Sequence, residues 1–399
     1  MPPFHRVELA QASQSEVVSW LERARPPRAM LDVGSLSLEP SVRFLLDAAG
    51  FGRHTFFCGQ SGSGKSYALG TVLEQLLVQT RLRIVVLDPN SDFVRLSTVR
   101  DGVEEQIAAL YRRAAGDVVV RRGEATEGER LHVRFTDCDA DEQAAVLRLD
   151  PIRDRDEYSA LVDLLESGFE SSDSSARDVA DRLLHSSDAM QRALGARLRN
   201  LGIHRWQIWS SGAADSIQDL VGSGGPRVLV VDLGSLETWG EKAIAAESVL
   251  AALWRRRGER DPTLVVIDEA HNVCPREPGD EIITLATEHA ARIAAEGRKF
   301  GLYLLLSTQR PQRVNELVVS QCDNLVLMRT ASRGDLAYLI ETLSFVPEPL
   351  VEYAGTFRPG EGLVAGRFTS HPAFVRFGPR LAEEGGGDVP ATWAEVGEP

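Results

Sequence analysis

The segment Gly59–Ser66 carries the clearest chemical signal in this sequence. It matches G-x-x-x-x-G-K-S/T at every fixed position, the pattern of a loop that wraps around phosphate groups. A strand-like run precedes it and a helical pattern follows it, so backbone N–H groups at a helix N-terminus would supply positive potential. We expect ATP and Mg²⁺ as cofactors, with Lys65 reaching the β- and γ-phosphates and the Ser66 hydroxyl ligating Mg²⁺. The residues predicted to bind the nucleotide are Gly59, Gln60, Ser61, Gly62, Ser63, Gly64, Lys65, Ser66 and Tyr67.

Two carboxylates, Asp268 and Glu269, come directly after the apolar run Leu264–Ile267. A phosphate-binding loop of this kind needs an acidic residue at the end of another strand to hold the metal, and hydrolysis needs a second group to orient the attacking water. We therefore assign Asp268 to Mg²⁺, through water, and Glu269 to the water. Asp232 ends the run Val228–Val231 without a second carboxylate after it, so a strand-end or capping role is the favoured interpretation for it.

Polar residues at the ends of two further strand-like runs are additional candidates. Gln309, with Ser307 and Thr308 before it, closes the run Leu302–Leu306, on the strand expected beside the acidic one. A polar group there can touch the γ-phosphate or the water. Asp88 ends another run, and ligands of parallel sheets bind at the carboxyl ends of strands, so we expect it on the nucleotide side. For Gln309 a simple strand-to-loop transition stays open as the alternative, and for Asp88 a simple turn does.

A basic cluster lies between residues 292 and 313, with Glu296 as its single acid. Because the chain carries a net charge of −14, we interpret a basic cluster as functional. A solvated charged surface stays open as the alternative. An arginine here can complete the active site of a neighbouring subunit, where a residue supplied in trans lowers the barrier strongly. The cluster contains Arg292, Arg298, Lys299, Arg310 and Arg313.

The elements that must position these residues alternate between short apolar runs and helical patterns, which indicates a mainly parallel sheet covered on both faces. We predict an α/β fold, a RecA-like P-loop NTPase core with an inserted helical subdomain and a short C-terminal tail. The expected strands are 54–58, 83–87, 228–231, 264–267, 302–306, 325–328, 362–368 and 373–377, and the expected helices are 16–23, 65–78, 242–257 and 281–296.

The predicted division of the chain follows from where these patterns change. Between about 138 and 220, apolar residues at helical spacing replace the alternation of strands and helices. One such stretch runs from Tyr158 to Phe169, and the Ser/Asp-rich segment Ser171–Ser175 separates it from the next. The predicted units are a lead-in at 1–50 without a full β-barrel, the ATPase core at 51–137 and 223–355, a helical insertion at 138–222, and C-terminal strands with a flexible tail at 356–399.

Length and composition are those of an ordinary globular protein. The chain has 399 residues, of which 43% are hydrophobic and 26% charged, which suggests two or three units and excludes a fully disordered chain. No run approaches the roughly 18 apolar residues of a membrane helix, and Met1–Leu9 lacks the pattern of a secretion signal. The four cysteines lie far apart, so we expect no zinc ribbon, no disulfide scaffold and a reducing cytoplasm.

Taken together, the motifs resemble the HerA-type ATPases of the HerA–FtsK superfamily, which are P-loop DNA translocases. The resemblance covers about 52–135 and 226–380. It implies a hexameric ring with ATP between subunits and duplex DNA in the central channel. It also implies Glu269 as catalytic base, Gln309 as sensor, Asp88 as an additional acid near the nucleotide, and Arg298, rather than Arg292, as the trans arginine finger. The matching segments are His54, Gly59–Ser66, Leu87–Asn90, Ile267–Asn272, Glu296–Gly301, Ser307–Pro311, Ser320–Asn324 and the tail from Ala373.

The sequence departs from that family in two places. Typical members begin with a β-barrel assembly domain, for which the first fifty or so residues are too few, and Asn90 replaces the usual His, whereas Asp92 stands where an acid is usual. Family members act with nucleases in DNA-end resection or anti-phage defence, so the resemblance implies a nuclease or other effector partner without choosing between these roles.

Two other ATPase classes share single motifs with this chain. Asp268–His271 spells the box of superfamily-two helicases, but no second arginine-rich helicase motif follows it. An ABC transporter ATPase would need a signature before its acidic strand, which Val221–Gly225 resembles only loosely. Two functions stay open: a motor that moves on duplex DNA, and a nucleotide-dependent assembly platform that organises an effector nuclease.

The net charge is −14, from 44 basic and 58 acidic residues, and the only lysines are Lys65, Lys242 and Lys299. Such a charge argues against indiscriminate coating of nucleic acid, because phosphate binding depends on Lys and Arg. A ring that threads DNA needs positive charge only along its channel, so the charge is compatible with that function. Lys242 has no role in any of these motifs.

Overall fold

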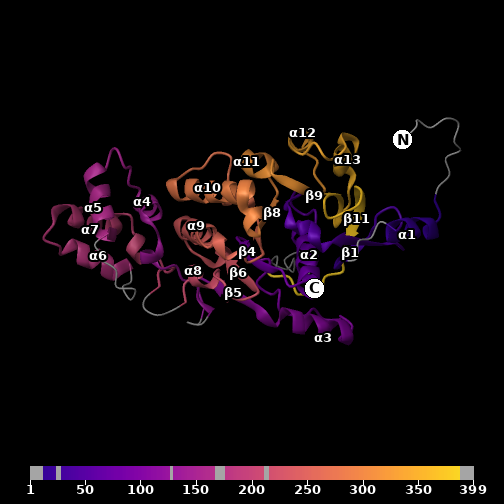
Figure 1. Ribbon diagram of the computed structural model, residues 1–399, viewed down its shortest axis with the longest axis horizontal. Coiled ribbons are helices and arrows are strands. Elements are labelled where there is room, and N and C mark those ends of the chain that lie inside the picture. The colour runs from indigo at the N-terminus through magenta and orange to yellow at the C-terminus, as the bar shows by residue number, and fades with distance from the viewer. Residues whose placement is uncertain (1–11, 24–27, 126–128, 167–175, 211–214, 387–399) are drawn as a thin grey trace, which may run out of the picture.

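The computed structural model describes residues 12–23, 28–125, 129–166, 176–210 and 215–386. Within these ranges eleven strands form one sheet, in the order β2-β1-β11-β10-β9-β3-β8-β7-β4-β6-β5, with helices packed against it (Figure 1). The strands are β1 (Met30–Leu36), β2 (Arg43–Asp47), β3 (His54–Cys58), β4 (Arg83–Asp88), β5 (Val118–Arg122), β6 (Val228–Asp232), β7 (Thr263–Ile267), β8 (Leu302–Thr308), β9 (Cys322–Met328), β10 (Glu361–Gly366) and β11 (Ala373–Phe377). The α-helices are α1 (Gln14–Arg23), α2 (Lys65–Gln79), α3 (Glu105–Ala114), α4 (Ala140–Leu147), α5 (Arg155–Glu166), α6 (Ala176–Leu184), α7 (Ala189–Asn200), α8 (Ile217–Leu220), α9 (Trp239–Arg255), α10 (Glu281–Glu296), α11 (Glu316–Val319), α12 (Arg333–Thr342) and α13 (Glu348–Glu352).

The sheet is mainly parallel, as predicted. The strands from β9 to β5 in this order pair in parallel, and β10, β11, β1 and β2 continue the β9 edge by antiparallel pairing. β8 lies between β3, which leads into the glycine-rich loop, and β7, which leads into the two carboxylates. The prediction that the strand ending near Gln309 lies beside the acidic strand is confirmed.

Both faces of the central strands are covered, which explains why these strands are continuous apolar runs in the sequence. All five residues of β3 are buried. Phe56 belongs to the core that includes Ile244 of α9 and Ile283 of α10, whereas Phe57 belongs to the core that includes Leu69 of α2. Successive side chains of a strand point to opposite faces, so the sheet separates the two cores. The predicted α/β fold class is therefore confirmed.

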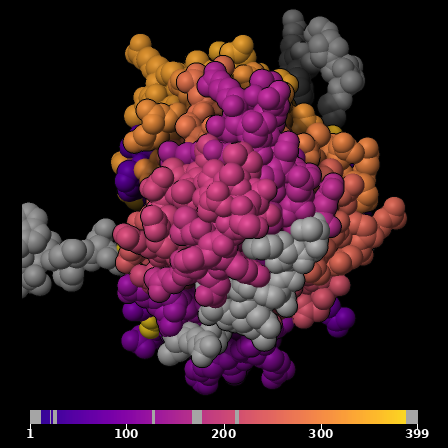
Figure 2. Space-filling view, turned by 90° about the vertical axis from the view of Figure 1, so that its left-hand side faces the viewer, coloured from indigo at the N-terminus to yellow at the C-terminus, as the bar shows by residue number. Residues whose placement is uncertain are grey.

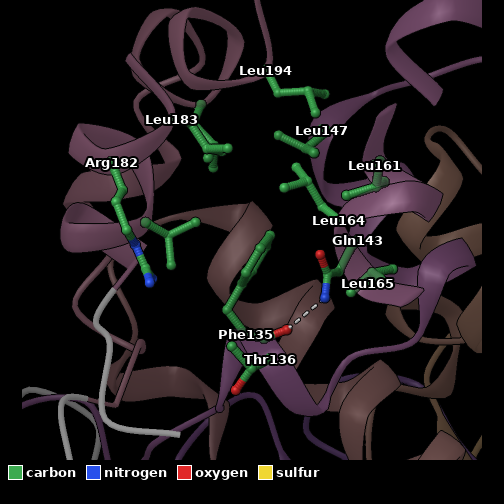
Figure 3. A pocket seen from close by; sticks show the side chains of 12 residues that line it. Phe135, Thr136, Gln143, Leu147, Leu161, Leu164, Leu165, Arg182, Leu183 and Leu194 are labelled. Atoms are coloured by element: carbon green, nitrogen blue, oxygen red, sulfur yellow. Dashed lines mark hydrogen bonds between the residues drawn. The ribbon is translucent and has the colours of Figure 1, made fainter. Parts of the chain in front are cut away.

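Helices α5, α6 and α7 form a lobe at one end of the molecule, on the left of Figure 1 and facing the viewer in Figure 2. Leucines of these helices, such as Leu161 and Leu194, surround a cavity of about 40 Å³ (Figure 3). Gln143 of α4 lines it and donates a hydrogen bond to the Phe135 carbonyl oxygen, 3.2 Å away. The predicted helical stretch from Tyr158 to Phe169 overlaps α5, which ends at Glu166. Its last residue, Phe169, lies outside the described residues, as does the Ser/Asp-rich segment Ser171–Ser175.

One helix was predicted before residue 50, whereas the strands β1 and β2 were not predicted. β1 pairs with β11, and β2 pairs with β1. In β1 Leu31 and Val33 are buried, and in β2 Phe44 and Leu46 are, but these alternations of two apolar residues are too short to distinguish from a loop. The edge strand β5 and helix α3 were also missed. The division of the chain into units stays a prediction, and the predicted flexible tail from residue 387 lies outside the described ranges.

Residues 378–386, which we call the C-terminal strap, pack along α2 and end at the turn after β4. Arg380 Nε donates to Glu74 Oε1 at 2.9 Å, and both side chains are 1% exposed. Further along, Gly385 N donates to the Asp92 carbonyl oxygen at 3.0 Å. A Cβ atom on Gly385 would lie 2.0 Å from the Ser91 carbonyl oxygen, so only glycine fits this approach. The strap thus joins α2 to the turn that follows β4.

In the part of the chain that the structure describes, none of the helices combines the length and the apolar character needed to span a bilayer.

Candidate active site

The segment Gly59–Ser66 forms the turn between β3 and α2. Gly62 and Gly64 have φ angles of +71° and +86°, which glycine adopts without strain. A Cβ atom on Gly59 would lie 2.5 Å from the Met328 Cβ, so glycine also lets the loop pass close to β9. No side chain caps the N-terminus of α2. The loop therefore presents a helix N-terminus whose N–H groups can bind phosphate oxygens.

Lys65 lies at the centre of a buried cluster formed by the ends of three elements. Its Nζ is 2.7 Å from Asp268 Oδ1, 3.2 Å from Glu269 Oε1 and 2.8 Å from Ser307 Oγ. Ser307 in turn donates to Asp268 Oδ1 at 2.6 Å. Burial by itself would lower the pKa of Lys65, but the two carboxylates outweigh it and raise that pKa, so the ammonium stays charged. The fold thus brings the predicted lysine and both predicted carboxylates together.

Glu269 is held in an unusual backbone conformation. Its φ angle is +44°, a region that costs a non-glycine residue about 1–3 kcal/mol. Gln309 donates its side-chain N–H to Glu269 Oε1 at 2.8 Å and its backbone N–H to Oε2 at 3.3 Å. His271 Nδ1 lies 3.3 Å from the same Oε2, and burial lowers the pKa of this histidine. The end of β8 therefore fixes the orientation of the Glu269 carboxylate.

A third carboxylate, Asp92, reaches the loop from the turn after β4. Ser66 donates its hydroxyl to Asp92 Oδ2 at 2.7 Å. Asp88 holds this turn, because its carboxylate accepts the N–H groups of Asp92 at 3.0 Å and Phe93 at 2.8 Å. Burial raises the pKa of Asp88 to about 7. Asp88 thus lies at the carboxyl ends of the strands, but of the two acids in this turn it is Asp92 that contacts the nucleotide-binding loop.

The oxygen atoms near the loop fit Mg²⁺. Ser66 and Asp92 supply a hydroxyl and a carboxylate, and Asp268 Oδ2 is buried without a hydrogen bond from any described residue. Among the described residues, no group of three or more His, Cys, Asp or Glu side chains could hold a metal by itself. Mg²⁺ keeps several waters and binds through one or two protein groups together with substrate phosphates, and Ser66 and Asp92 offer such groups.

Two of the predicted nucleotide contacts hold the loop and the strap in place. Gln60 N donates to the Arg329 carbonyl oxygen at 2.9 Å, and Gln60 Oε1 accepts the Ala331 N–H at 3.1 Å, so Gln60 ties the loop to the chain after β9. Tyr67 Oη accepts the Arg380 N–H at 3.1 Å. Tyr67 therefore connects the first turn of α2 to the C-terminal strap.

The two candidate finger arginines lie away from the Lys65 cluster of their own chain. Arg298 directly precedes β8, at the amino end of the strands, whereas Lys65 follows the carboxyl end of the parallel strand β3. Arg298 Nη1 donates to Asp323 Oδ2 at 3.0 Å. Arg292 pairs with Glu288 one turn earlier on α10, at 3.4 Å. The fold does not bring either arginine to this site from within the chain.

Residues for which the sequence analysis predicted no catalytic or binding role also belong to this site. Asp92 and Ser307 contact the loop directly, and His271 contacts Glu269. The signal for Asp92 was the resemblance to HerA-type ATPases, in which an acid is usual at this position, and the signal for Ser307 was a hydroxyl at a strand end. Asp232, by contrast, caps the turn after β6 by accepting the Ser235 N–H, so the capping role favoured for it is confirmed.

This fold and this site define a RecA-like P-loop ATPase. The family model described as "Helicase HerA, central domain" matches residues 31–247, more than half of the chain. The chain therefore belongs to the HerA helicase family, and the resemblance to HerA-type ATPases is confirmed.

Curated relatives and solved structures agree with this assignment. The DNA double-strand break repair helicase HerA of Sulfurisphaera tokodaii is 32% identical over 158 residues, which are 38% of this chain and 31% of that protein. The Pyrococcus furiosus protein of the same name is 23% identical over 87% of this chain and 69% of its own length. The chain thus matches only about a third of the first relative.

Two solved structures share the fold at 15% identity. The structure of VirB4 of Thermoanaerobacter pseudethanolicus has a TM-score of 0.60 and covers 89% of this chain and 98% of that chain. The bacterial conjugative coupling protein TrwBdeltaN70, in its unbound monoclinic form, has a TM-score of 0.56 and covers 92% and 94%.

Proposed function

We propose that this protein is an ATP-hydrolysing, ring-forming translocase of duplex DNA. The observation that carries the proposal is the buried cluster of Lys65, Asp268 and Glu269 beside the glycine-rich loop. Membership of the HerA helicase family and the two relatives named DNA double-strand break repair helicases support DNA as the substrate.

The loop would hold the phosphates of ATP and the metal. Lys65 would exchange its contact with Glu269 for oxygens of the β- and γ-phosphates, which frees the Glu269 carboxylate for water. The N–H groups at the start of α2 would bind the same phosphates. Ser66 would hold Mg²⁺ directly and Asp268 through water, with Asp92 beside them. When bound, the metal neutralises the charge of the phosphates.

Hydrolysis would use the groups at the ends of β7 and β8. Glu269 orients a water molecule and takes its proton as the oxygen forms a bond to the γ-phosphorus and the bond to the leaving oxygen of ADP breaks. Gln309 already donates two hydrogen bonds to the Glu269 carboxylate. Loss of the γ-phosphate would therefore change the hydrogen bonds of Gln309 and, with them, the conformation of the chain at the end of β8.

A second subunit would complete the site. Arg298 lies at the amino ends of the parallel strands, whereas Lys65 lies at their carboxyl ends. The Arg298 side chain is 38% exposed. In a head-to-tail ring, a hexamer by the family pattern, Arg298 of one subunit can face the nucleotide of the next, with duplex DNA in the central channel. Arg292 on α10 is the weaker candidate for this trans role.

The biological setting is a cytoplasmic DNA-processing or anti-phage defence system in which the ring works with a nuclease or another effector. A second candidate function uses the same site differently. In that alternative the ring binds nucleotide chiefly to organise the effector and moves little on DNA. The stabilised Glu269 carboxylate favours hydrolysis, and hence the motor.

The motor and the platform differ in how DNA affects turnover. We expect duplex DNA to raise the rate of ATP hydrolysis at least severalfold, because a translocase couples each hydrolysis step to a DNA contact. A steady-state phosphate-release assay with and without linear duplex DNA checks this. Turnover that is indifferent to DNA over the whole range of saturating concentrations would contradict the motor and favour the platform.

A further inference from the structure

One cation of this chain has no role in the site described above. Lys242 is one of only three lysines and is half-buried near the start of α9. It lines a cavity of about 130 Å³ between the first halves of α9 and α10 and the turns that follow β4, β6 and β7. We call this space the Lys242 cavity. Its volume is that of a few water molecules at ~30 Å³ each, so it suits a small group and not a helix or a whole nucleotide.

The polar groups that line the Lys242 cavity suit an anion. Besides Lys242, the polar lining residues are Asn90 and Asn272, and no Asp or Glu is among the residues that line the cavity. Within the described part of the chain, no hydrogen bond or ion pair engages the Lys242 ammonium. An ammonium and two amide N–H donors together match the oxygens of a phosphate group.

An exposed tryptophan is also among the residues that line this cavity. Trp239 is 52% exposed, and its Nε1 donates a hydrogen bond to Asp280 Oδ2 at 3.3 Å. The N-terminus of α9 is already capped by Thr238 and Glu241, so the side chains, and not the helix terminus, make this place distinctive. A fixed, half-exposed indole beside a cation is the combination that binds nucleic-acid strands, by stacking and by phosphate contact.

The Lys242 cavity shares its walls with the candidate active site. Asn90 belongs to the turn whose Asp92 accepts the Ser66 hydroxyl. Asn272 ends the turn that begins at Glu269, and its N–H donates to the Glu269 carbonyl oxygen at 2.8 Å. Parallel sheets bind ligands at the carboxyl ends of their strands, and this cavity lies there, beside β4, β6 and β7. A ligand in it would contact both turns that carry the groups around the nucleotide.

We propose that the Lys242 cavity binds one phosphodiester group of DNA. Lys242 pairs with the phosphate, Asn90 and Asn272 donate N–H groups to its oxygens, and the Trp239 ring covers the adjoining sugar or base. Through Asn90 and Asn272, the bound phosphate would contact the two turns that carry Asp92 and Glu269. The proposal rests on the proposed function, because it takes DNA as the substrate.

The test compares the Lys242→Ala protein with wild type and with Arg155→Ala, which removes an exposed cation of α5 that pairs with its neighbour Asp156. Binding of labelled duplex and single-stranded DNA is measured by fluorescence anisotropy over a range of salt concentrations. Losing one charged contact should weaken DNA binding about tenfold and lower the slope of log Kd against log salt by about one. Arg155→Ala should match wild type, and Lys242→Arg should recover most of the loss.

Each outcome decides the proposal. Equal affinity and equal salt slope for wild type and a folded Lys242→Ala protein, as judged by thermal unfolding, would overturn it. A loss of affinity for free ATP analogue or inorganic phosphate with unchanged DNA binding would also overturn it, because the anion would then be a free phosphate. If wild type itself binds no DNA at low salt, the proposed function fails, and this inference fails with it.

Discussion

Replacing Lys65 by alanine should leave a protein that binds ATP about ten- to a hundredfold more weakly and hydrolyses none of it measurably. A charge-assisted hydrogen bond contributes about 1.5–3 kcal/mol to binding, and the same ammonium stabilises the charge that develops on the γ-phosphate. The measurements are equilibrium binding of a fluorescent ATP analogue and steady-state phosphate release.

The substitution has a structural cost that must be separated from the chemistry. Lys65 is 6% exposed and is the cation that neutralises Asp268 and Glu269, and removing one partner of a buried ion pair costs about 3–5 kcal/mol. Thermal unfolding of each protein controls for this, and Arg112→Ala is the matched cation deletion, because Arg112 is exposed and pairs with Glu105 on α3. Normal turnover in a folded Lys65→Ala protein would refute the assignment of the loop.

Removing Arg298 should stop hydrolysis while sparing ATP affinity. An arginine supplied in trans contributes about 10³–10⁵-fold to turnover, and the position of Arg298 at the amino edge of the sheet keeps it from the ATP of its own subunit. Phosphate release by Arg298→Ala should therefore fall by about that factor, with an unchanged dissociation constant for ATP analogue. Arg292→Ala, which removes a cation of the preceding helix α10, should keep most of the activity.

A mixing experiment distinguishes a trans arginine from a structural one. Arg298→Ala subunits keep Glu269, and Glu269→Gln subunits keep Arg298, so mixed rings contain some interfaces with both groups intact. Activity should partly return when the two inactive proteins are combined. Absence of any rescue, in mixtures shown to exchange subunits, would argue against the trans role of Arg298.

The central strands and the loop could be predicted because their physics is local. A buried parallel strand such as β3 is a continuous apolar run, and Gly59–Ser66 has its glycines at the places where the backbone needs φ > 0 or a close approach. The pairing of Lys65 with the carboxylates after β7 followed from one rule, that parallel strands present their ends at one edge.

What the sequence did not reveal depends on contacts between distant segments. Asp88 was expected near the nucleotide, yet its oxygens hold the turn, and Asp92 reaches Ser66. That choice depends on how one turn is bent. Strand β1 pairs with β11, some 340 residues further along the chain, and β2 pairs with β1. No local pattern of two buried residues encodes such a distant partner.

The measurement that tests the central claim most directly is ATP-driven displacement of a third strand from a triplex on linear duplex DNA. Wild type with ATP should release the third strand in a time that grows with the length of duplex ahead of it. The Glu269→Gln protein should bind ATP and DNA but release none, because its carboxamide cannot take the proton of the water. ATP hydrolysis by wild type without any displacement, or displacement by Glu269→Gln at the wild-type rate, would contradict a translocase powered by this site.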